Sequence, residues 1–510
     1  MAGTAFWLVL IASWGCRPVQ PTGAGPIPEG REARVAFFHD FVAKTVLRTA
    51  FSPPKWRALG TDYRTWVEGS GLREEFAQAE TTDALWHAVH RLNHSRRDRH
   101  LRVRGPVPPL RCIPVRFYPD LQDDNAPSFF VANLDASAQT QGVERGDQLV
   151  AVDGIPVADV VERLWWEAPY SSPLNFYVRG LGNGGPYPGL LSCAVGPAGH
   201  EGPDVARLTL RNAKGEREVA LPRTPPRPVE WMYEPLFPGR RSTHADIWRR
   251  RYLNLGLKAI AENRDATLYV DHDRRLAVLE WVALSDVERT LPEIVDAAER
   301  ANVLDYGLVL DLTHGRGGSR SEQVVAAMAD APFKTTFGNV RVDDVAFARA
   351  HLDQHSRAVR SWIRQALAQG ASFTTNEPFK LRHFPRGSDG MMQPARRRFT
   401  GRKVALFFPW GGSNLDQFAA MIVDNPQLGI HSMGMSPGGY SNTWEWSESL
   451  DVPGLGPVVF SWTVGHTIRP NGEVLEGNPA RAVDWRPLTQ DNASTYLISL
   501  LEAGMAYVER

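Results

Sequence analysis

The segment from Lys403 to Phe418, KVALFFPWGGSNLDQF, constrains the fold more than any other part of the chain. Its apolar run at 404–408 is typical of a buried strand, a Gly-Gly step follows, and the apolar spacing after Ser413 is helical. A strand that turns through glycines into a helix places the turn residue at the helix N-terminus, where amides favour negative charge. Ser413 therefore has the position of a nucleophile beside an oxyanion-stabilising amide. Serine is also a preferred N-cap, and Asp416 three residues on resembles a capping box, so a structural role stays open.

Strand and helix patterns alternate after residue 230. Strands are predicted at 266–270, 276–282, 307–312, 404–408 and 457–462, and helices at 243–262, 291–302, 344–369, 414–424 and near 492–508. The run at 307–312, GLVLDL, is nearly continuous in apolar residues, as in a strand buried on both faces. The alternation predicts an α/β core.

Proline-rich and glycine-rich steps divide the chain into regions of different pattern. The predicted divisions are a signal segment at 1–16, a linker at 17–30, an N-terminal helical region at 31–105, a mainly β module at 106–228 and the α/β core at 229–510.

The N-terminal apolar run at 5–15, AFWLVLIASWG, is too short to span a bilayer and is typical of a secretory signal. The residues that end it, SWGC, resemble a bacterial lipoprotein signal in which Cys16 would carry the lipid. We expect an exported protein, either periplasmic, secreted or held at the cell envelope, with a lipid on Cys16 as its only membrane attachment. A frayed apolar N-terminus without a targeting role is the alternative.

Charge and cysteine content narrow the classes of function. Lys plus Arg and Asp plus Glu both total 57, so the chain lacks the basic excess of a nucleic-acid-binding protein. Apart from Cys16, the cysteines are Cys112 and Cys193, which either pair in an oxidising compartment or remain two separate buried thiols. Their spacing does not resemble a zinc site.

A nucleophilic serine needs a base near neutral pH. No lysine follows Lys403, so a Ser/Lys dyad with a downstream lysine is impossible, and a histidine is the expected base. His100 stands at an element boundary, where a side chain can project into a cleft. Composition does not identify the acid that would orient the imidazole. Four carboxylates qualify: Asp311, Asp416, Glu476 and Asp484.

Three further histidines lie just upstream of His100 at helical spacing: His87, His90 and His94. They have the spacing of metal ligands, but no cysteine or close carboxylate cluster completes such a site. We interpret them as part of a surface helix and expect neither a metal nor another cofactor.

Five short motifs follow one another in a recognisable order. They are Asp98-Arg99-His100, GVERGDQLVAVDGIPV at Gly142–Val157, DLTHGRGG at Asp311–Gly318, SNLDQF at Ser413–Phe418 and EGNPARAVDWRP at Glu476–Pro487. With these motifs the chain resembles, over most of 85–490, the C-terminal processing or tail-specific serine peptidases, in the branch of the tricorn-core peptidases and protease-like activity factors.

The resemblance implies a ClpP/crotonase-like α/β peptidase core, a PDZ-like module at 106–228 and a catalytic histidine in the N-terminal helical region. It implies that Ser413 is the nucleophile, that His100 is the general base and that Glu476 orients His100. The amide of Asn414 and one from Gly317 or Gly318 would form the oxyanion hole. The implied activity is that of a serine endopeptidase acting on proteins or peptides, in which the PDZ-like module binds substrate by edge addition or gates the site.

The chain departs from the family pattern in two places that matter. Thr313 and Gly315 stand where the family has Arg and Asn, so we expect the oxyanion loop to be held differently. The stretch 165–202 is an insertion in the PDZ-like region. The altered loop motivates a second hypothesis, a catalytically inactive peptide-binding or ligand-binding protein on the same scaffold. A PDZ-type adaptor is the third.

Overall fold

The computed structural model describes most of the chain. The described residues are 26–45, 63–100, 102–104, 111–123, 126–168, 170–182, 188–193, 204–225, 228–233, 243–342, 357–378 and 388–510. The predicted signal segment, and the predicted linker up to residue 25, lie outside them. In the described part of the chain, no helix has the length and apolar character needed to cross a lipid bilayer.

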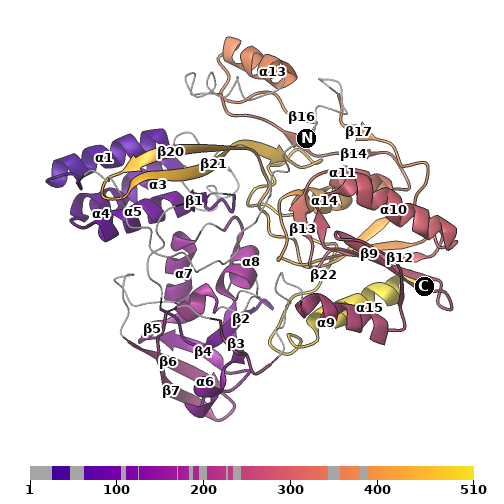
Figure 1. Cartoon of the computed structure of the whole chain (residues 1–510), viewed down its shortest axis with the longest axis horizontal. Coiled ribbons are helices and arrows are strands. Elements are labelled where there is room, and N and C mark those ends of the chain that lie inside the picture. The colour runs from indigo at the N-terminus through magenta and orange to yellow at the C-terminus, as the bar shows by residue number, and fades with distance from the viewer. Residues whose placement is uncertain are drawn as a thin grey trace, which may run out of the picture.

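A seven-stranded sheet forms the centre of the C-terminal half (Figure 1). Its strands, in spatial order, are β22 (Asp484–Trp485), β19 (Ile430–Gly434), β18 (Lys403–Phe407), β12 (Gly307–Asp311), β10 (Leu276–Trp281), β9 (Ala266–Asp271) and β8 (Lys258–Glu262). The strands from β22 to β10 are parallel, while β9 and β8 are antiparallel additions at one edge. The predicted α/β class is therefore confirmed.

Helices cover both faces of this sheet. They are α9 (Thr243–Asn254), α10 (Val287–Arg300), α11 (Ser321–Ala326), α14 (Asn414–Val423) and α15 (Tyr496–Val508). Leu308 and Leu310 of β12 pack in the cluster that includes α10, α11 and α14, whereas Val309 packs in the cluster that includes α9 and α15. Successive residues of a strand point to opposite faces. The apolar run at 307–312 is thus explained by burial on both sides.

The N-terminal helices pack against a long hairpin of the core rather than against the central sheet (Figure 1). The helices are α1 (Arg31–Lys44), α3 (Tyr63–Gly69), α4 (Leu72–Gln78) and α5 (Thr82–His94), and the hairpin is β20 (Asn442–Val452) with β21 (Gly456–Ile468). Phe41 meets Phe460 edge to face at 5.1 Å between ring centroids. Strand β1 (Arg102–Arg104) pairs antiparallel with β21 and so fixes the segment that follows His100 to the core.

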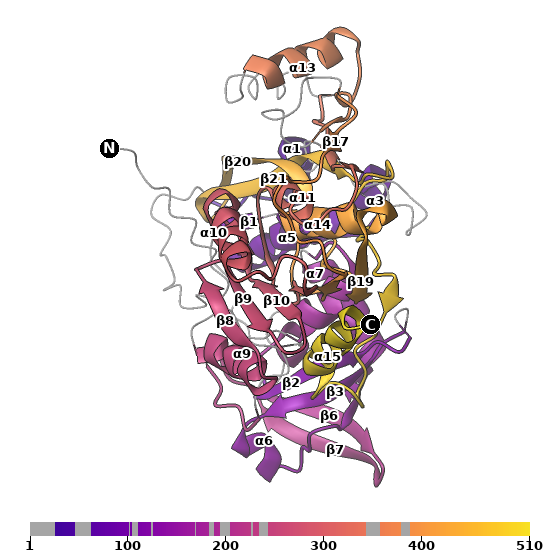
Figure 2. The ribbon, with the colours of Figure 1, turned by 90° about the vertical axis from the view of Figure 1, so that its right-hand side faces the viewer.

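The mainly β module folds around a six-stranded sheet, seen in the lower part of Figure 2. Its strands are β2 (Val115–Asp120), β3 (Ser128–Leu134), β4 (Gln148–Val152), β5 (Ile155–Pro156), β6 (Val205–Asn212) and β7 (Gly215–Pro222), and its helices are α6 (Ala136–Thr140) and α7 (Val157–Glu167). The Gly-Asp step before β4 is explained by Asp147, whose buried carboxylate accepts the Glu144 amide at 2.7 Å and the Asn212 side-chain amide at 2.8 Å.

The described part of the insertion at 165–202 contains three short helical segments. They are α8 (Pro173–Asn175), the π-helical segment η2 (Phe176–Leu181) and the 3₁₀ segment η3 (Leu190–Cys193). Cys193 forms a disulfide with Cys112, which decides between the two alternatives left open by the sequence.

Most predicted core elements form, with one error of type. The helix predicted at 243–262 ends with α9 at Asn254, and 258–262 is strand β8. Lys, Ala and Glu favour a helix there, but Gly256 adopts φ 83°, and β8 pairs with β9 from Lys258 to Glu262 with one register shift between Ala259 and Ala261. Of the helix predicted at 344–369, the structure describes only the part from 357 on, where α13 covers Arg357–Ala368.

Short strands complete the described elements. They are β11 (Ala283–Leu284), β13 (Arg316–Gly318), β14 (Phe333–Lys334), β15 (Phe337–Gly338), β16 (Glu377–Pro378) and β17 (Met391–Met392), with one 3₁₀ turn, η4 (Pro426–Leu428).

Candidate active site

Ser413 occupies the sharp turn between β18 and α14. Its backbone lies at φ 62° and ψ −124°, a conformation rare for a residue with a side chain. The Ser413 amide donates to the Tyr440 carbonyl at 2.8 Å, which holds the turn. The hydroxyl makes no capping hydrogen bond to α14. The strand–turn–helix geometry predicted from the sequence is therefore present, and the capping alternative is wrong.

Gly317 lies directly against Ser413. A Cβ atom at Gly317 would be 2.5 Å from the Ser413 Cβ and 3.1 Å from its Oγ, so only glycine fits. The Arg316 amide donates to the Val282 carbonyl at 2.9 Å in the pairing of β13 with β11. Because successive amides of a strand point to opposite sides, the Gly317 amide faces away from β11.

Gly318 has a different environment. A Cβ atom there would lie 2.0 Å from the Leu284 carbonyl oxygen, so Gly318 is required by its close approach to β11. Of the two glycines that the resemblance left open for the oxyanion hole, Gly317 is the one beside Ser413.

Asn414 is the first residue of the ten-residue helix α14. Its side-chain oxygen accepts the Ser321 amide at 2.9 Å, and its side-chain nitrogen donates to Gln417 at 2.9 Å. These bonds fix the start of α14 to the residues that follow the Gly-rich loop. The Asn414 backbone amide thus sits at a rigid helix N-terminus next to Ser413.

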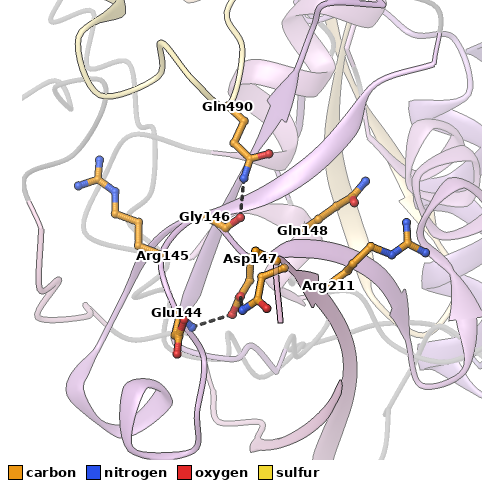
Figure 3. A pocket seen from close by; sticks show the side chains of 9 residues that line it. Glu144, Arg145, Gly146, Asp147, Gln148, Arg211 and Gln490 are labelled. Atoms are coloured by element: carbon orange, nitrogen blue, oxygen red, sulfur yellow. Dashed lines mark hydrogen bonds between the residues drawn. The ribbon is translucent and has the colours of Figure 1, made fainter. Parts of the chain in front are cut away.

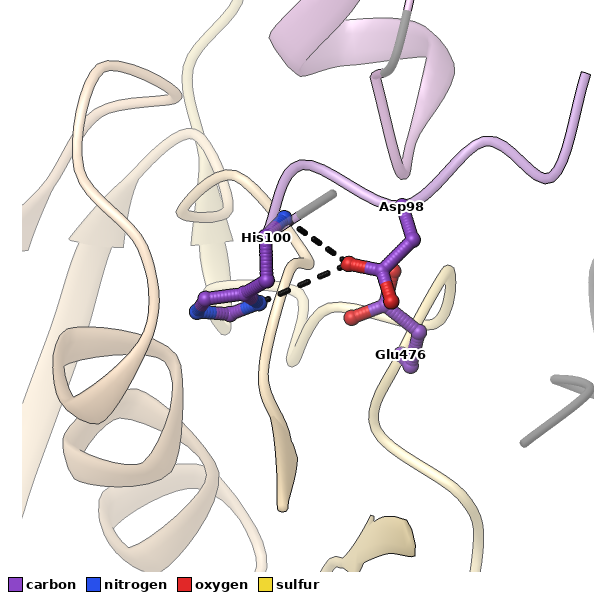
Figure 4. A group of neighbouring side chains, drawn as sticks. All are labelled: Asp98, His100 and Glu476. Carbon is purple, nitrogen blue, oxygen red and sulfur yellow. Dashed lines mark hydrogen bonds and ion pairs between the residues drawn. The ribbon is translucent and has the colours of Figure 1, made fainter. Parts of the chain in front are cut away.

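His100 and Glu476 are brought together from distant parts of the chain, and Asp98 joins them (Figure 4). One ligand atom from each of the three side chains lies within 4.8 Å of the others. The His100 Nδ1 is 3.5 Å from Asp98 Oδ1, which also accepts the His100 backbone amide at 2.8 Å. Glu476 is completely buried, and the His100 side chain is 11% exposed.

These three groups could also meet a metal ion. Tetrahedral zinc sites hold their nitrogen and oxygen ligands about 3.3 Å from one another. The three donor atoms lie within 4.8 Å of one another. A histidine flanked by two acids explains this grouping without a metal, as in the triad of a serine hydrolase.

Tyr440 is the neighbour that Ser413 and His100 share. Its ring meets the His100 ring edge to face at 5.5 Å, and its carbonyl accepts the Ser413 amide at 2.8 Å. A Cβ atom at Gly412 would lie 2.0 Å from the ring, so the Gly-Gly step before Ser413 allows this close approach. The histidine and the serine are therefore positioned around one residue.

Asp416 holds the backbone at Tyr440 in place. Its buried carboxylate accepts the Gly439 amide at 2.8 Å and the Tyr440 amide at 3.0 Å. Burial raises the pKa of Asp416 to about 7, the two backbone hydrogen bonds oppose that rise, and the Glu476 carboxylate adds to it. Asp416 thus holds the backbone around the serine, and the charges of Glu476 and His100 both act on its carboxylate.

The other two candidate acids have different partners. Asp311 accepts the Tyr252 hydroxyl at 2.7 Å and the Thr313 hydroxyl at 2.6 Å. Thr313, which replaces the arginine of the family motif, therefore holds the Gly-rich loop through Asp311. Asp484 of β22 pairs at 2.9 Å with Arg486, which follows the strand.

The upstream histidines of α5 pack with one another and with Trp86. The His90 ring meets Trp86 at 4.4 Å and His94 at 5.0 Å, both edge to face. Burial, followed by the neighbouring histidines, holds the pKa of His90 well below its usual value. In the described part of the chain, Asp98, His100 and Glu476 form the only group of three or more potential metal ligands, and none of the α5 histidines belongs to it.

A separate cavity of about 490 Å³ lies on the mainly β module (Figure 3). It is polar and lined by Glu144, Arg145, Gly146, Asp147, Gln148, Arg211, Asn212, Ala213 and Gln490. Gln490 reaches it from the C-terminal region and donates to the Gly146 carbonyl at 2.6 Å. None of the predicted site residues lines this cavity.

Solved structures identify the fold. Mature CPAF aligns with 94% of this chain and 97% of its own, at a TM-score of 0.60 and 16% identity. The complex of mature CPAF with lactacystin aligns with 94% of this chain and 98% of its own, at 0.58 and 16%. The photosystem II D1 C-terminal processing protease aligns with 94% of this chain and 98% of its own. Its TM-score of 0.39 and identity of 11% are too low to support an argument.

Sequence comparison adds nothing to this likeness: no family model and no curated protein matches the chain. At such low identities a structural likeness shows the fold. The predicted resemblance to the C-terminal processing peptidases is confirmed at that level, over nearly the whole chain.

Proposed function

We propose that this chain, which has the fold of mature CPAF and the ordered motifs of the C-terminal processing peptidases, is a serine endopeptidase. The observation that carries the proposal is the convergence on Tyr440 of a strained serine at a helix N-terminus and a histidine flanked by buried carboxylates. These are the parts that nucleophilic acyl transfer requires.

The chemistry follows from the placement of each group. The Ser413 hydroxyl attacks the carbonyl carbon of the peptide, and His100 accepts its proton. His100 Nδ1 faces Asp98, so Nε2 is the nitrogen available to the serine. His100 then protonates the leaving amine, and a water molecule, activated in the same way, hydrolyses the acyl-serine ester.

Negative charge develops on the carbonyl oxygen in the tetrahedral intermediate. The amides of Gly317 and Asn414 lie next to Ser413 on two different elements, the Gly-rich loop and α14. We assign the oxyanion hole to these two amides, because preorganised donors stabilise the developing charge without reorganisation.

Two acids compete to orient His100. We assign this role to Glu476, as the resemblance implies, with Asp98 as a second support that also binds the His100 backbone amide. Glu476→Gln and Asp98→Asn, compared in kcat, separate the two. The larger loss is expected for Glu476→Gln, and a larger loss for Asp98→Asn would exchange the assignments.

The remaining features are part of the same proposal. The mainly β module at 106–228 is proposed to be PDZ-like and to bind or gate peptide substrates, and the core at 229–510 to be crotonase-like. The disulfide supports export, since such bonds persist in oxidising compartments. Lipidation of Cys16 remains a proposal.

Hydrolysis of casein or a peptide library by the wild type and by Ser413→Ala tests the function. We expect cleavage by the wild type and a loss of at least about 1,000-fold in the variant. Equal cleavage by both proteins would end the proposal. Absence of cleavage by both, with a folded wild type, would favour the binding-protein hypothesis.

A further inference from the structure

The insertion at 165–202 contacts both halves of the candidate site, although it belongs to another module. Ser172 Oγ donates to the Gly438 carbonyl at 2.6 Å, and the Asn175 side-chain amide donates to the Pro409 carbonyl at 2.6 Å. On the other side, Ser171 Oγ accepts the Arg99 amide at 3.0 Å, next to His100. The insertion therefore binds the backbone around Ser413 and the backbone around His100.

Arg179 is the buried charge within this insertion. It is 6% exposed and lies in η2, a π-helical segment, which is a rare conformation found frequently at functional sites. Its Nη1 donates to the Trp410 carbonyl at 3.0 Å and to the Tyr440 hydroxyl at 2.7 Å. Within the described residues Arg179 forms no ion pair, so both of these bonds are to neutral oxygens.

Both acceptors belong to the machinery around the serine. Trp410 is in the turn that leads into Ser413, and Tyr440 touches Ser413 through its carbonyl and His100 through its ring. A buried guanidinium without a carboxylate partner is costly to retain unless it has a task. Its Nη1 carries two N–H groups, and each of them serves one of these acceptors.

We infer that Arg179 is a positioning residue for catalysis: by binding Trp410 and Tyr440 it holds Ser413 and His100 in register. The inference rests on the proposed function and deepens it, because it adds a residue that lies in none of the five motifs. The predicted consequence is a loss of turnover with little change in substrate affinity, since Arg179 is buried and binds the residues that hold the reacting groups.

A double-mutant cycle with Arg179→Met and Tyr440→Phe tests the inference. We expect Arg179→Met to lower kcat by roughly 10- to 100-fold and to change KM by less than about threefold. Tyr440→Phe keeps the ring beside His100 and should cost less. The double variant should resemble Arg179→Met, because both changes break one interaction. Effects that multiply, or a kcat of Arg179→Met equal to that of the wild type, would overturn the inference.

Chemical rescue and a matched control exclude a merely structural effect. Guanidinium ion at millimolar concentration should restore part of the kcat of Arg179→Ala and none of that of Ser413→Ala. Arg116 is a buried arginine of the same module that stacks over Trp231 at 4.2 Å. Arg116→Met should lower stability but leave kcat within about twofold. Loss of kcat in that variant, or no rescue, would indicate general destabilisation instead.

Hydrogen exchange separates failure of this inference from failure of the proposed function. Amides at 410–416 and 438–441 should exchange faster in Arg179→Met than in the wild type, whereas those of β3 should not. This readout needs no activity. If the wild type cleaves nothing, unchanged exchange in these segments would still overturn the positioning role.

Discussion

At the scale of single residues, Gly317 is a position beside Ser413 that has no room for a larger side chain. A Cβ atom there would lie 2.5 Å from the Ser413 Cβ, closer than such contacts allow. We predict that Gly317→Ala lowers kcat/KM by at least about 100-fold, because the serine or the proposed oxyanion amide must move. Steady-state peptide hydrolysis measures this.

Gly69→Ala is the matched control for that substitution. It adds the same methyl group at the end of α3, where no atom lies within 4 Å of it. Its kcat/KM should equal that of the wild type. A Gly317→Ala enzyme with normal activity would show that the Gly-rich loop does not contact the reacting serine.

Sequence could predict the residues that lie in short motifs, but not those that act through the backbone. Ser413, His100 and Glu476 stand in ordered motifs, and the structure gathers them around Tyr440 or beside one another. Arg179 leaves no such signal, because it binds a main-chain carbonyl and a hydroxyl more than 200 positions away. The sequence identified Asp98 as the first residue of the motif Asp98-Arg99-His100 but did not predict that its carboxylate lies beside the imidazole.

At the scale of elements, strand β10, which pairs with β12 next to the Gly-rich loop, should make the stability of the protein depend on pH through Glu280. Burial, and then the neighbouring Asp311 carboxylate, raise the pKa of Glu280 on β10 to about 8. The unfolded chain releases this proton near pH 4.5, whereas the folded protein retains it to about pH 8. The folded state therefore binds more protons in that interval, and stability falls as pH rises through it.

Glu280→Gln removes that contribution. The free energy of unfolding of the variant minus that of the wild type should grow by about 4 kcal/mol between pH 4.5 and pH 8, and stay constant above about pH 9. Urea unfolding at several pH values measures the difference. A difference that does not change with pH would mean that Glu280 is ionised in the folded protein throughout.

The disulfide should stabilise the module that carries the insertion. It joins Cys112 to Cys193 across 81 positions, and closing a loop of this length removes entropy from the unfolded chain worth about 4 kcal/mol. We predict that the double substitution Cys112→Ser and Cys193→Ser lowers the free energy of unfolding by about this amount. Urea unfolding measures the change as a lower midpoint.

Reductant supplies the control for the disulfide. It should lower the midpoint of the wild type and leave that of the double serine variant unchanged. Two thiols that react with a thiol reagent in the denatured, unreduced protein would contradict the pairing. The sequence alone could not decide between the pair and two separate thiols, because the contact depends on the fold of the insertion.

Element types were predictable where the pattern of burial is simple. The apolar run at 307–312 identified a strand buried on both faces, as β12 is. The five residues of β8 were misassigned to a helix, because their composition is compatible with both and their pairing with β9 is set by the tertiary structure.

At the scale of the whole molecule, the candidate site is assembled from three regions. The N-terminal helical region supplies His100, the mainly β module supplies the insertion with Arg179, and the core supplies Ser413 and Glu476. The contact of β1 with β21 holds the first region, and the bonds from Ser172, Asn175 and Arg179 hold the second. No local pattern encodes this convergence, so the order of motifs could suggest a site but not its geometry.

The most direct test of the central claim is the position of covalent labelling by a fluorophosphonate, mapped by mass spectrometry of the digested protein. A serine activated by His100 should carry the adduct at Ser413 in the wild type, and the labelling rate should fall by at least about 100-fold in His100→Gln. An adduct on another residue, or labelling at Ser413 that does not depend on His100, would contradict a serine-histidine peptidase.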